Sequence, residues 1–115
     1  NEANPGFFLD NPLFAAELIR ELGNAGPGML FDTYHAAATD IDILTFFETH
    51  LDIISHVQVS DFPGRHEPGT GTLPFDDFFK LLDHLNYPGW VGCEYKPATD
   101  TSSGLGWAAE FITPA

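Results

Sequence analysis

Apolar residues recur with the period of a helix in the first segment of the chain. They occupy every fourth position between Asn11-Pro12, a pair that often begins a helix, and Gly23, a residue that often ends one. The recurring residues are Phe14, Leu18 and Leu22. The pattern therefore predicts an amphipathic helix between Asn11 and Gly23.

Three later segments show the same helical period. Asp40 is expected to cap a second helix, whose apolar face carries Leu44, Phe47 and Leu51. Pro74 is followed by the pair Asp76-Asp77, and negative charge suits the amino end of a third helix. The apolar stripe of that helix is expected to comprise Phe75, Phe78, Leu82 and Leu85. A last short helix is predicted over 104–112.

Strand patterns lie between these helices. The apolar run 29–31 ends in Asp32, and the segment 54–60 alternates with a period of two. In this second strand we expect the polar set His56, Gln58 and Ser60, and not the valines, to lie on the better-protected face. A turn at Pro88-Gly89 leads into a third strand over 90–95.

The order helix-strand-helix-strand-helix-strand-helix predicts an α/β fold. Strands that alternate with helices form parallel sheets with right-handed crossovers. At 115 residues the chain fits one domain, 1–115, with one modest core. The repeating unit is one helix and one strand, so the chain holds about three or four β/α units.

Each predicted strand ends in a polar side chain. Asp32, Gln58 and Glu94 lie near the carboxyl ends of the three strands, where parallel α/β folds place their ligand sites. Two carboxylates and an amide oxygen that converge there suit a hard cation such as Mg²⁺ or Mn²⁺. The alternative is that such strand-end residues only cap neighbouring helices, as Asp32 could do for the helix that follows it.

Composition narrows the choice of partners and of compartment. Four Lys plus Arg against seventeen Asp plus Glu give a formal net charge of −13, which argues against nucleic acid as a partner. No apolar run is long enough to span a membrane, so we expect no membrane association. Cys93 is the single cysteine, so no intrachain disulfide can form, and a cytoplasmic location is expected.

Three motifs resemble the hydroxypyruvate isomerase family, which belongs to the xylose-isomerase-like (β/α)8 TIM barrels. They are FDTYH (31–35), HVQVSDFPGRHEPGTG (56–71) and GCEYKPA (92–98), in the order expected for that family. The resemblance extends from about Gly6 to Trp107. It implies a partial TIM barrel, because a complete one needs about 200 residues or more.

The resemblance also implies roles for individual residues. Asp32, Gln58 and Glu94 match the second, third and fourth ligands of a divalent metal, Mg²⁺ or Mn²⁺, and Glu94 also matches one of two proton-transferring glutamates. His35 and Arg65 match residues that contact the substrate. The alternative for His35 is a solvated loop histidine.

Three further polar residues, Lys96, His66 and Glu67, have less specific roles. Lys96 is a further candidate for substrate contact, with an ion pair to a nearby acid as the alternative. His66 and Glu67 are interpreted as residues that fix the shape of their loop.

The chain also departs from the family pattern. Its three strands resemble the sixth, seventh and eighth of the barrel, so the first metal-binding glutamate of the fifth strand is not matched, and Glu2 is the only acid near that place. Half a barrel leaves two open sheet edges. We therefore expect a homodimer or a higher homo-oligomer.

The implied reaction is that of an aldose-ketose type isomerase. Hydroxypyruvate and 2-hydroxy-3-oxopropanoate (tartronate semialdehyde) would interconvert by proton transfer through an enediolate that the metal stabilises. Alternatives are a related sugar epimerase, a 2-oxo-tetronate isomerase, or a non-catalytic half-barrel that folds as an oligomer. In each enzymatic case the partner is a small 2-oxo acid or a sugar.

Overall fold

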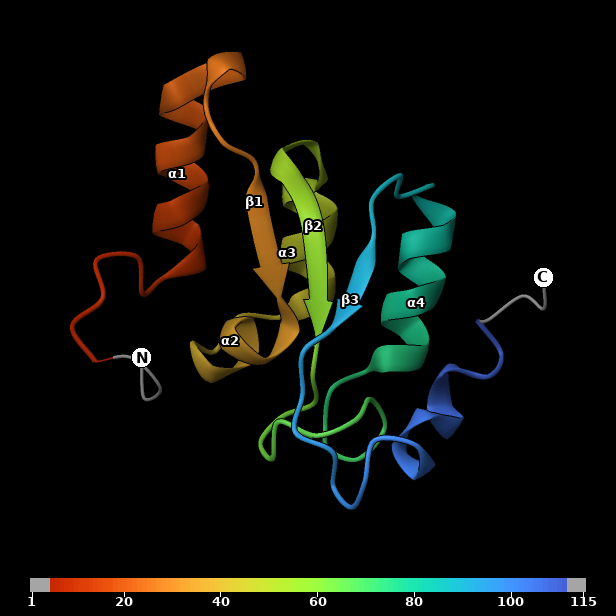
Figure 1. Cartoon of the computed structure of the whole chain (residues 1–115). Helices are drawn as coiled ribbons and strands as arrows, with labels where there is room; N and C mark the ends of the chain where they lie inside the picture. The colour runs from red at the N-terminus through yellow and green to blue at the C-terminus, as the bar shows by residue number, and fades with distance from the viewer. Residues whose placement is uncertain (1–4, 112–115) are drawn as a thin grey trace.

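Three parallel strands form the centre of the molecule, and the computed structural model describes residues 5–111. The strands are β1 (Met29–Asp32), β2 (Ile54–Val59) and β3 (Val91–Cys93), in the order β1-β2-β3. Figure 1 shows them pointing the same way, with β2 in the middle. The predicted α/β class and parallel order are therefore confirmed.

Four α-helices accompany the sheet in the described part of the chain. They are α1 (Pro12–Leu22), α2 (Thr33–Ala38), α3 (Ile43–His50) and α4 (Phe75–His84). Three short 3-10 helices, Gly23–Ala25, Leu51–Ile53 and Ser103–Ala108, complete the regular structure of these residues. In Figure 1, α1 lies beside β1, α2 lies near the carboxyl ends of the strands, α3 lies behind the sheet, and α4 lies beyond β3.

The helix starts follow from local chemistry. The Asn11 side chain accepts a hydrogen bond from the Leu13 N–H, with Pro12 at the first helical position, as predicted for α1. The second predicted cap is wrong, because Asp42 and not Asp40 accepts from the Thr45 N–H at the start of α3. Asp40 instead has a φ of 59° and lies in the turn before the helix.

The core lies on one face of the sheet. Val57 and Val59 of β2 are 0% exposed, and with Phe31 they pack against the apolar sides of α3 and α4. Phe47 and Phe78 contribute the facing rings, 5.4 Å apart between centroids. The expectation that the polar residues would occupy the better-protected face is therefore wrong for the strand itself.

The opposite face of the sheet is open. His56 and Gln58 are only partly buried on that face, because no helix or strand of residues 5–111 covers it in Figure 1. Ser60, just past the strand, is fully buried. The polar side of β2 thus borders open space, and the apolar side forms the core.

Two other boundaries differ from the sequence prediction. β3 spans Val91–Cys93 and not 90–95, and Glu94 follows it with its N–H donated to the Val59 carbonyl at 3.2 Å. The last helix is a 3-10 helix, and position 112 of the predicted helix lies outside the described residues. Glu2, the acid considered for the first metal ligand, also lies outside them.

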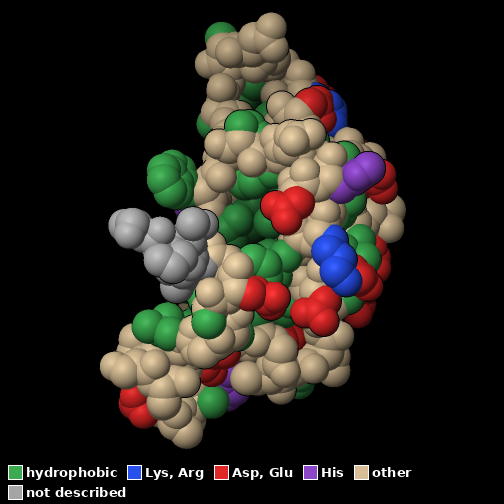
Figure 2. Space-filling model, turned by 90° about the vertical axis from the view of Figure 1, so that its right-hand side faces the viewer, with side chains coloured by type: hydrophobic (Ala, Val, Ile, Leu, Met, Phe, Trp, Pro, Cys, Tyr) green, Lys and Arg blue, Asp and Glu red, His purple; other side chains and the backbone are tan. Residues whose placement is uncertain are grey.

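Hydrophobic side chains remain exposed at both sides of the sheet. Phe7, Phe8 and Leu22 are 60%, 76% and 53% exposed near α1, and Trp90 is 84% exposed beside β3. On the side of α4, Figure 2 shows hydrophobic side chains at the surface between acidic ones. None of the helices in residues 5–111 is both long enough and apolar enough to cross a bilayer.

Candidate functional site

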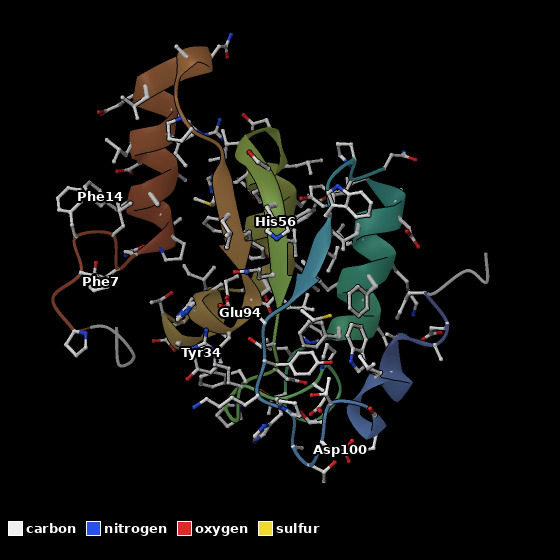
Figure 3. The ribbon with its side chains drawn as sticks, in the orientation of Figure 1. Phe7, Phe14, Tyr34, His56, Glu94 and Asp100 are labelled. Carbon is white, nitrogen blue, oxygen red and sulfur yellow. The ribbon has the colours of Figure 1, made fainter. Side chains whose placement is uncertain are left out.

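The parallel register brings the predicted strand-end residues together. Asp32 of β1 is the register partner of Gln58 of β2, and Gln58 is the partner of Gly92 of β3. Glu94 lies two residues beyond Gly92, on the same face by the period of a strand. Figure 3 shows Glu94 and Tyr34 at the end of the sheet to which the strands point.

These residues border one open cavity of about 590 Å³. Its polar lining includes the predicted residues Asp32, His35, Gln58, Arg65 and Glu94, together with Asp10, Asn11 and Thr39. Its apolar side comes from α1, the segment before it and β1, and includes Leu9, Leu18 and Leu30. All the predicted metal ligands and two of the three predicted substrate contacts therefore share one site.

The two oxygens of Asp32 have different surroundings. Oδ1 accepts hydrogen bonds from the N–H groups of Tyr34 at 2.9 Å and His35 at 3.1 Å, which makes Asp32 the cap of α2. Oδ2 is buried and has no hydrogen-bond partner among the described residues. Capping thus accounts for one oxygen only, and the other is a buried acceptor that needs a partner.

Arg65 supplies the positive charge of the site. Its guanidinium carbon lies 5.0 Å from the centre of the Tyr34 ring, within range of a cation-π contact. Its Nη2 atom lies 3.4 Å from His35 Nε2 and 3.7 Å from Glu94 Oε2. Arg65 thus faces two of the groups predicted to act on the substrate.

Lys96 takes a different position from the other predicted site residues. Its N–H donates to the Arg65 carbonyl at 2.9 Å, and its carbonyl lies 2.7 Å from His66 Nδ1. Lys96 itself does not border the cavity. In this structure the backbone of Lys96 holds the loop that carries Arg65. Direct contact between the Lys96 side chain and the substrate stays a prediction.

Two buried carboxylates hold the loop that carries Arg65. Asp61 accepts four backbone N–H groups of the loop, and Glu67 accepts the Ala98 N–H through both oxygens, at 3.0 and 3.2 Å. The sequence interpretation of Glu67 as a loop-fixing residue agrees with this contact. The sequence prediction does not include Asp61, although an acid between a strand and a loop with several glycines is a recognisable signal for such a role.

Thr33 joins the ends of β1 and β2 beneath the site. Its hydroxyl donates to the Ser60 carbonyl at 2.9 Å and accepts from the Ser60 N–H at 3.1 Å. Both residues are 0% exposed. This contact spans 27 positions, so no local sequence pattern indicates it.

The donor set fits a hard divalent cation. Asp32 Oδ2 is an unpartnered buried oxygen, and the Gln58 amide and the Glu94 carboxylate border the same cavity. Such oxygen donors are the kind that Mg²⁺ and Mn²⁺ prefer. Among residues 5–111 no group of three or more His, Cys, Asp or Glu side chains is arranged to hold a metal ion, so such a site would also depend on the Gln58 amide oxygen.

A separate ion pair lies at the other end of the sheet. Arg20 Nη2 donates to Asp52 Oδ1 at 2.9 Å, just before the start of β2. The hydrogen bond from Arg20 holds the pKa of the Asp52 carboxyl below its ordinary value. Both groups are exposed at the amino end of the sheet, away from the carboxyl ends of the strands, and neither borders the cavity of the candidate site.

A family model for the xylose isomerase-like TIM barrel matches residues 1–112. The chain belongs to this family. Hydroxypyruvate isomerase of Escherichia coli (strain K12) is 40% identical over 103 residues, which is 90% of this chain and 40% of that protein. A 2-oxo-tetronate isomerase of Cupriavidus necator is 36% identical over 108 residues, covering 94% of this chain and 42% of that protein.

Solved structures show the same relationship. A crystal structure described as AP endonuclease, family 2, from Brucella melitensis matches with a TM-score of 0.91 at 37% identity, over 97% of this chain and 43% of that one. The 3-keto-D-glucoside 4-epimerase YcjR of E. coli matches with a TM-score of 0.74 at 27% identity, over 85% of this chain and 39% of that one. The chain therefore forms part of a TIM barrel and spans about 40% of the length of such relatives.

Proposed function

We propose that this chain carries part of the active site of an isomerase that acts on hydroxypyruvate. The observation that supports the proposal most directly is the unpartnered Asp32 Oδ2 in a cavity shared with Gln58, Glu94 and Arg65. Two of the relatives named above, a hydroxypyruvate isomerase and a 2-oxo-tetronate isomerase, act by name on small oxo acids.

Asp32, Gln58 and Glu94 are the residues that would hold a divalent cation, Mg²⁺ or Mn²⁺. When bound, the cation supplies Lewis-acid polarisation of the substrate oxygens. Asp32 can use Oδ2 for this purpose without giving up the cap of α2, because only Oδ1 accepts the capping hydrogen bonds.

Arg65 would bind the carboxylate of the substrate. A guanidinium offers two parallel N–H donors to a carboxylate, and Tyr34 supports its face. The chain has a formal net charge of −13, so an anionic substrate needs such a local cation. His35, 3.4 Å from Arg65, would place its Nε2 near the substrate oxygens.

Glu94 would transfer the proton. Its carboxylate is half-exposed at the mouth of the cavity and can reach a small ligand there. Removal of a proton from C3 of hydroxypyruvate gives an enediolate, and a proton delivered to C2 gives 2-hydroxy-3-oxopropanoate while the hydroxyl proton moves from O3 to O2. Among residues 5–111 Glu94 is the one glutamate that borders the cavity, so we expect a second proton-transferring group from elsewhere in the enzyme.

Two neighbouring functions use the same residues. A 2-oxo-tetronate isomerase, as in the C. necator relative, would carry out the equivalent proton transfer on a longer oxo acid. A sugar epimerase would lack the substrate carboxylate and would gain little from Arg65. The position of Arg65 in the cavity therefore favours an oxo acid over a neutral sugar.

The third alternative is a non-catalytic folded half-barrel. The chain spans about 40% of its relatives, so turnover by this chain alone is a proposal that needs a direct test. A DNA-directed activity is disfavoured by the net charge of −13, because DNA binding depends on Lys and Arg against phosphates.

The test follows hydroxypyruvate loss with added Mg²⁺ for the wild type, Glu94→Gln and Asp83→Asn. Asp83 is an exposed acid on α4 and serves as the matched control. The proposal predicts turnover that is slower than that of a full-length relative, because the second proton-transferring group is not among residues 5–111, and that Glu94→Gln abolishes and Asp83→Asn preserves. Turnover that survives Glu94→Gln would contradict the assigned role of Glu94. A wild type that binds hydroxypyruvate without converting it would favour the non-catalytic half-barrel.

A further inference from the structure

Asp61, two residues after β2, is a buried carboxylate that gathers the backbone of the following loop. It is 1% exposed. Its Oδ1 accepts from the N–H groups of Phe62 at 2.8 Å and Leu73 at 3.0 Å, and its Oδ2 accepts from Gly69 at 2.8 Å and Gly71 at 2.9 Å. One side chain therefore ties together both ends and the middle of the loop 62–73.

The backbone of Asp61 fixes the turn that presents Arg65. Its carbonyl accepts from the Arg65 N–H at 2.9 Å, and its N–H donates to the His66 carbonyl at 2.9 Å. Arg65 has a φ of 57°, a left-handed conformation that non-glycine residues keep only where surrounding contacts determine it. The Lys96 N–H holds the other side of the same residue, by donating to its carbonyl at 2.9 Å.

The Arg65 guanidinium borders the cavity, and the Asp61 carboxylate does not. Arg65 also reaches Tyr34, His35 and Glu94. The four N–H donors around the carboxylate satisfy its charge within the loop. Any influence of Asp61 on a bound ligand must therefore pass through the loop and Arg65.

We propose that Asp61 is a positioning residue for the anion-binding side of the site. Its carboxylate fixes the loop 62–73 so that the Arg65 guanidinium stays over Tyr34 and beside His35 and Glu94. The anion-binding part of this inference rests on the proposed function, in which Arg65 receives the substrate carboxylate. The positioning part rests on the hydrogen bonds and on the conformation of Arg65 alone.

The first experiment observes Arg65 directly. The chain has two arginines, Arg20 and Arg65, so a ¹H–¹⁵N spectrum of the side-chain Nε–H groups holds two signals, and Arg20 is an internal reference. The Tyr34 ring shifts the Arg65 signal, and a Tyr34→Leu variant identifies that shift. In Asp61→Asn an amide N–H₂ replaces one acceptor oxygen and opposes two backbone donors. We expect the Arg65 signal to move to the position that it has in Tyr34→Leu, while the Arg20 signal stays in place.

A matched control and a second variant complete the test. Asp83→Asn makes the same chemical change at an exposed site on α4 and should leave both signals unchanged. Gly71→Ala disturbs the same hydrogen bonds without altering the carboxylate, because its Cβ would collide with the Phe62 carbonyl oxygen and lie 2.7 Å from Asp61 Oδ1. An Arg65 signal that is unchanged in folded Asp61→Asn overturns the proposal. Unfolding of both variants also overturns it, since Asp61 would then have a structural role only.

The second experiment separates this inference from the proposed function. Hydroxypyruvate is titrated into the wild type, Asp61→Asn and Asp83→Asn in the presence of Mg²⁺. We expect the dissociation constant to rise about tenfold or more in Asp61→Asn and to stay unchanged in Asp83→Asn. Equal affinity in all three overturns the anion-binding part. A wild type that does not bind hydroxypyruvate contradicts the proposed function, while the Arg65 signal still decides the positioning role.

Discussion

Asp32 and Gln58 are register partners across β1 and β2, and both border the cavity at the carboxyl ends of the strands. This pairing follows from parallel strand geometry, in which residues at equal height on neighbouring strands point to the same side. Asp32 also caps α2 through one oxygen, so one residue links the start of a helix to the candidate metal site. Loss of Oδ1 would therefore remove the cap of α2, whereas loss of Oδ2 would remove an oxygen donor from the candidate metal site.

The open sheet predicts self-association. β1 and β3 are the outer strands of the described sheet, and large hydrophobic side chains near both are exposed. Unpaired strand edges and exposed apolar side chains both favour association with another chain. Sedimentation equilibrium is expected to give a mass of at least twice the 12.6 kDa of one chain. A monomer at all concentrations would contradict this prediction.

Truncation of the core at Phe47 should destabilise the fold strongly. Phe47 is 0% exposed and packs against the rings of Phe31, Phe78 and Tyr87. Phe47→Ala is expected to lower the free energy of unfolding by about 3–5 kcal/mol, because it leaves a cavity in the core. Phe8→Ala, at a ring that is 76% exposed, is the matched control and should cost less than about 1 kcal/mol. Chemical denaturation measures both, and equal losses would contradict the assignment of the core.

The Thr33 hydroxyl should matter more than its size suggests. Thr33→Val keeps the shape of the side chain but removes the partner of the buried Ser60 N–H and carbonyl. An unsatisfied buried group costs about 1–3 kcal/mol, so we expect the free energy of unfolding to fall by about 2 kcal/mol. Thr49→Val removes a hydroxyl that bonds the Thr45 carbonyl on the exposed side of α3 and should have little effect. Similar values for the two variants would show that the strand-end contact is unimportant.

The pH dependence of stability should include a contribution from Asp42. The hydrogen bond from the Thr45 N–H lowers the pKa of this carboxyl in the folded chain. The stability that it provides is therefore complete above the unfolded pKa, about 3.9, and is lost as the pH falls through the lower folded value. Asp42→Asn keeps the cap and should remove this dependence, whereas Asp42→Ala should cost about 1 kcal/mol at neutral pH. Denaturation between pH 2 and pH 7 checks both. Other carboxyls such as Asp52 keep their own contribution, so a pH dependence in Asp42→Asn that equals that of the wild type would argue against the assignment.

Hydrophobic periodicity and capping residues in the sequence correctly predict those helices and strands that short-range contacts determine. The alternation of helices and strands along the chain, the start of α1 at Asn11-Pro12 and the buried stripe of α4 follow from periodicity and capping. The strand-end residues Asp32 and Gln58 were placed correctly because the period of a strand fixes which side chains share a face. Register then brings them together without further information.

Other features depend on contacts that sequence patterns do not contain. α2 covers only six residues, too few for an apolar period. Asp40 and Asp42 both precede apolar residues, so the sequence alone does not distinguish which of the two acids caps α3. Glu67 meets Ala98 across 31 positions, and no local rule predicts such a pair. His56 and Gln58 are partly exposed because no helix or strand of residues 5–111 covers their face of the sheet, and a local pattern cannot predict this.

The most direct test of the proposed metal site is a Mn²⁺ titration followed by calorimetry. It compares the wild type with Asp32→Asn and Glu94→Gln, and Asp83→Asn serves as the control. Asp32→Asn is especially informative, because the asparagine oxygen can still cap α2. The position of Oδ2 is then taken by an amide N–H₂, which cannot bind a cation, and the side chain has no negative charge. The account predicts that Mn²⁺ affinity falls at least about tenfold in both site variants and is unchanged in the control. Equal Mn²⁺ affinity in all four proteins would contradict it.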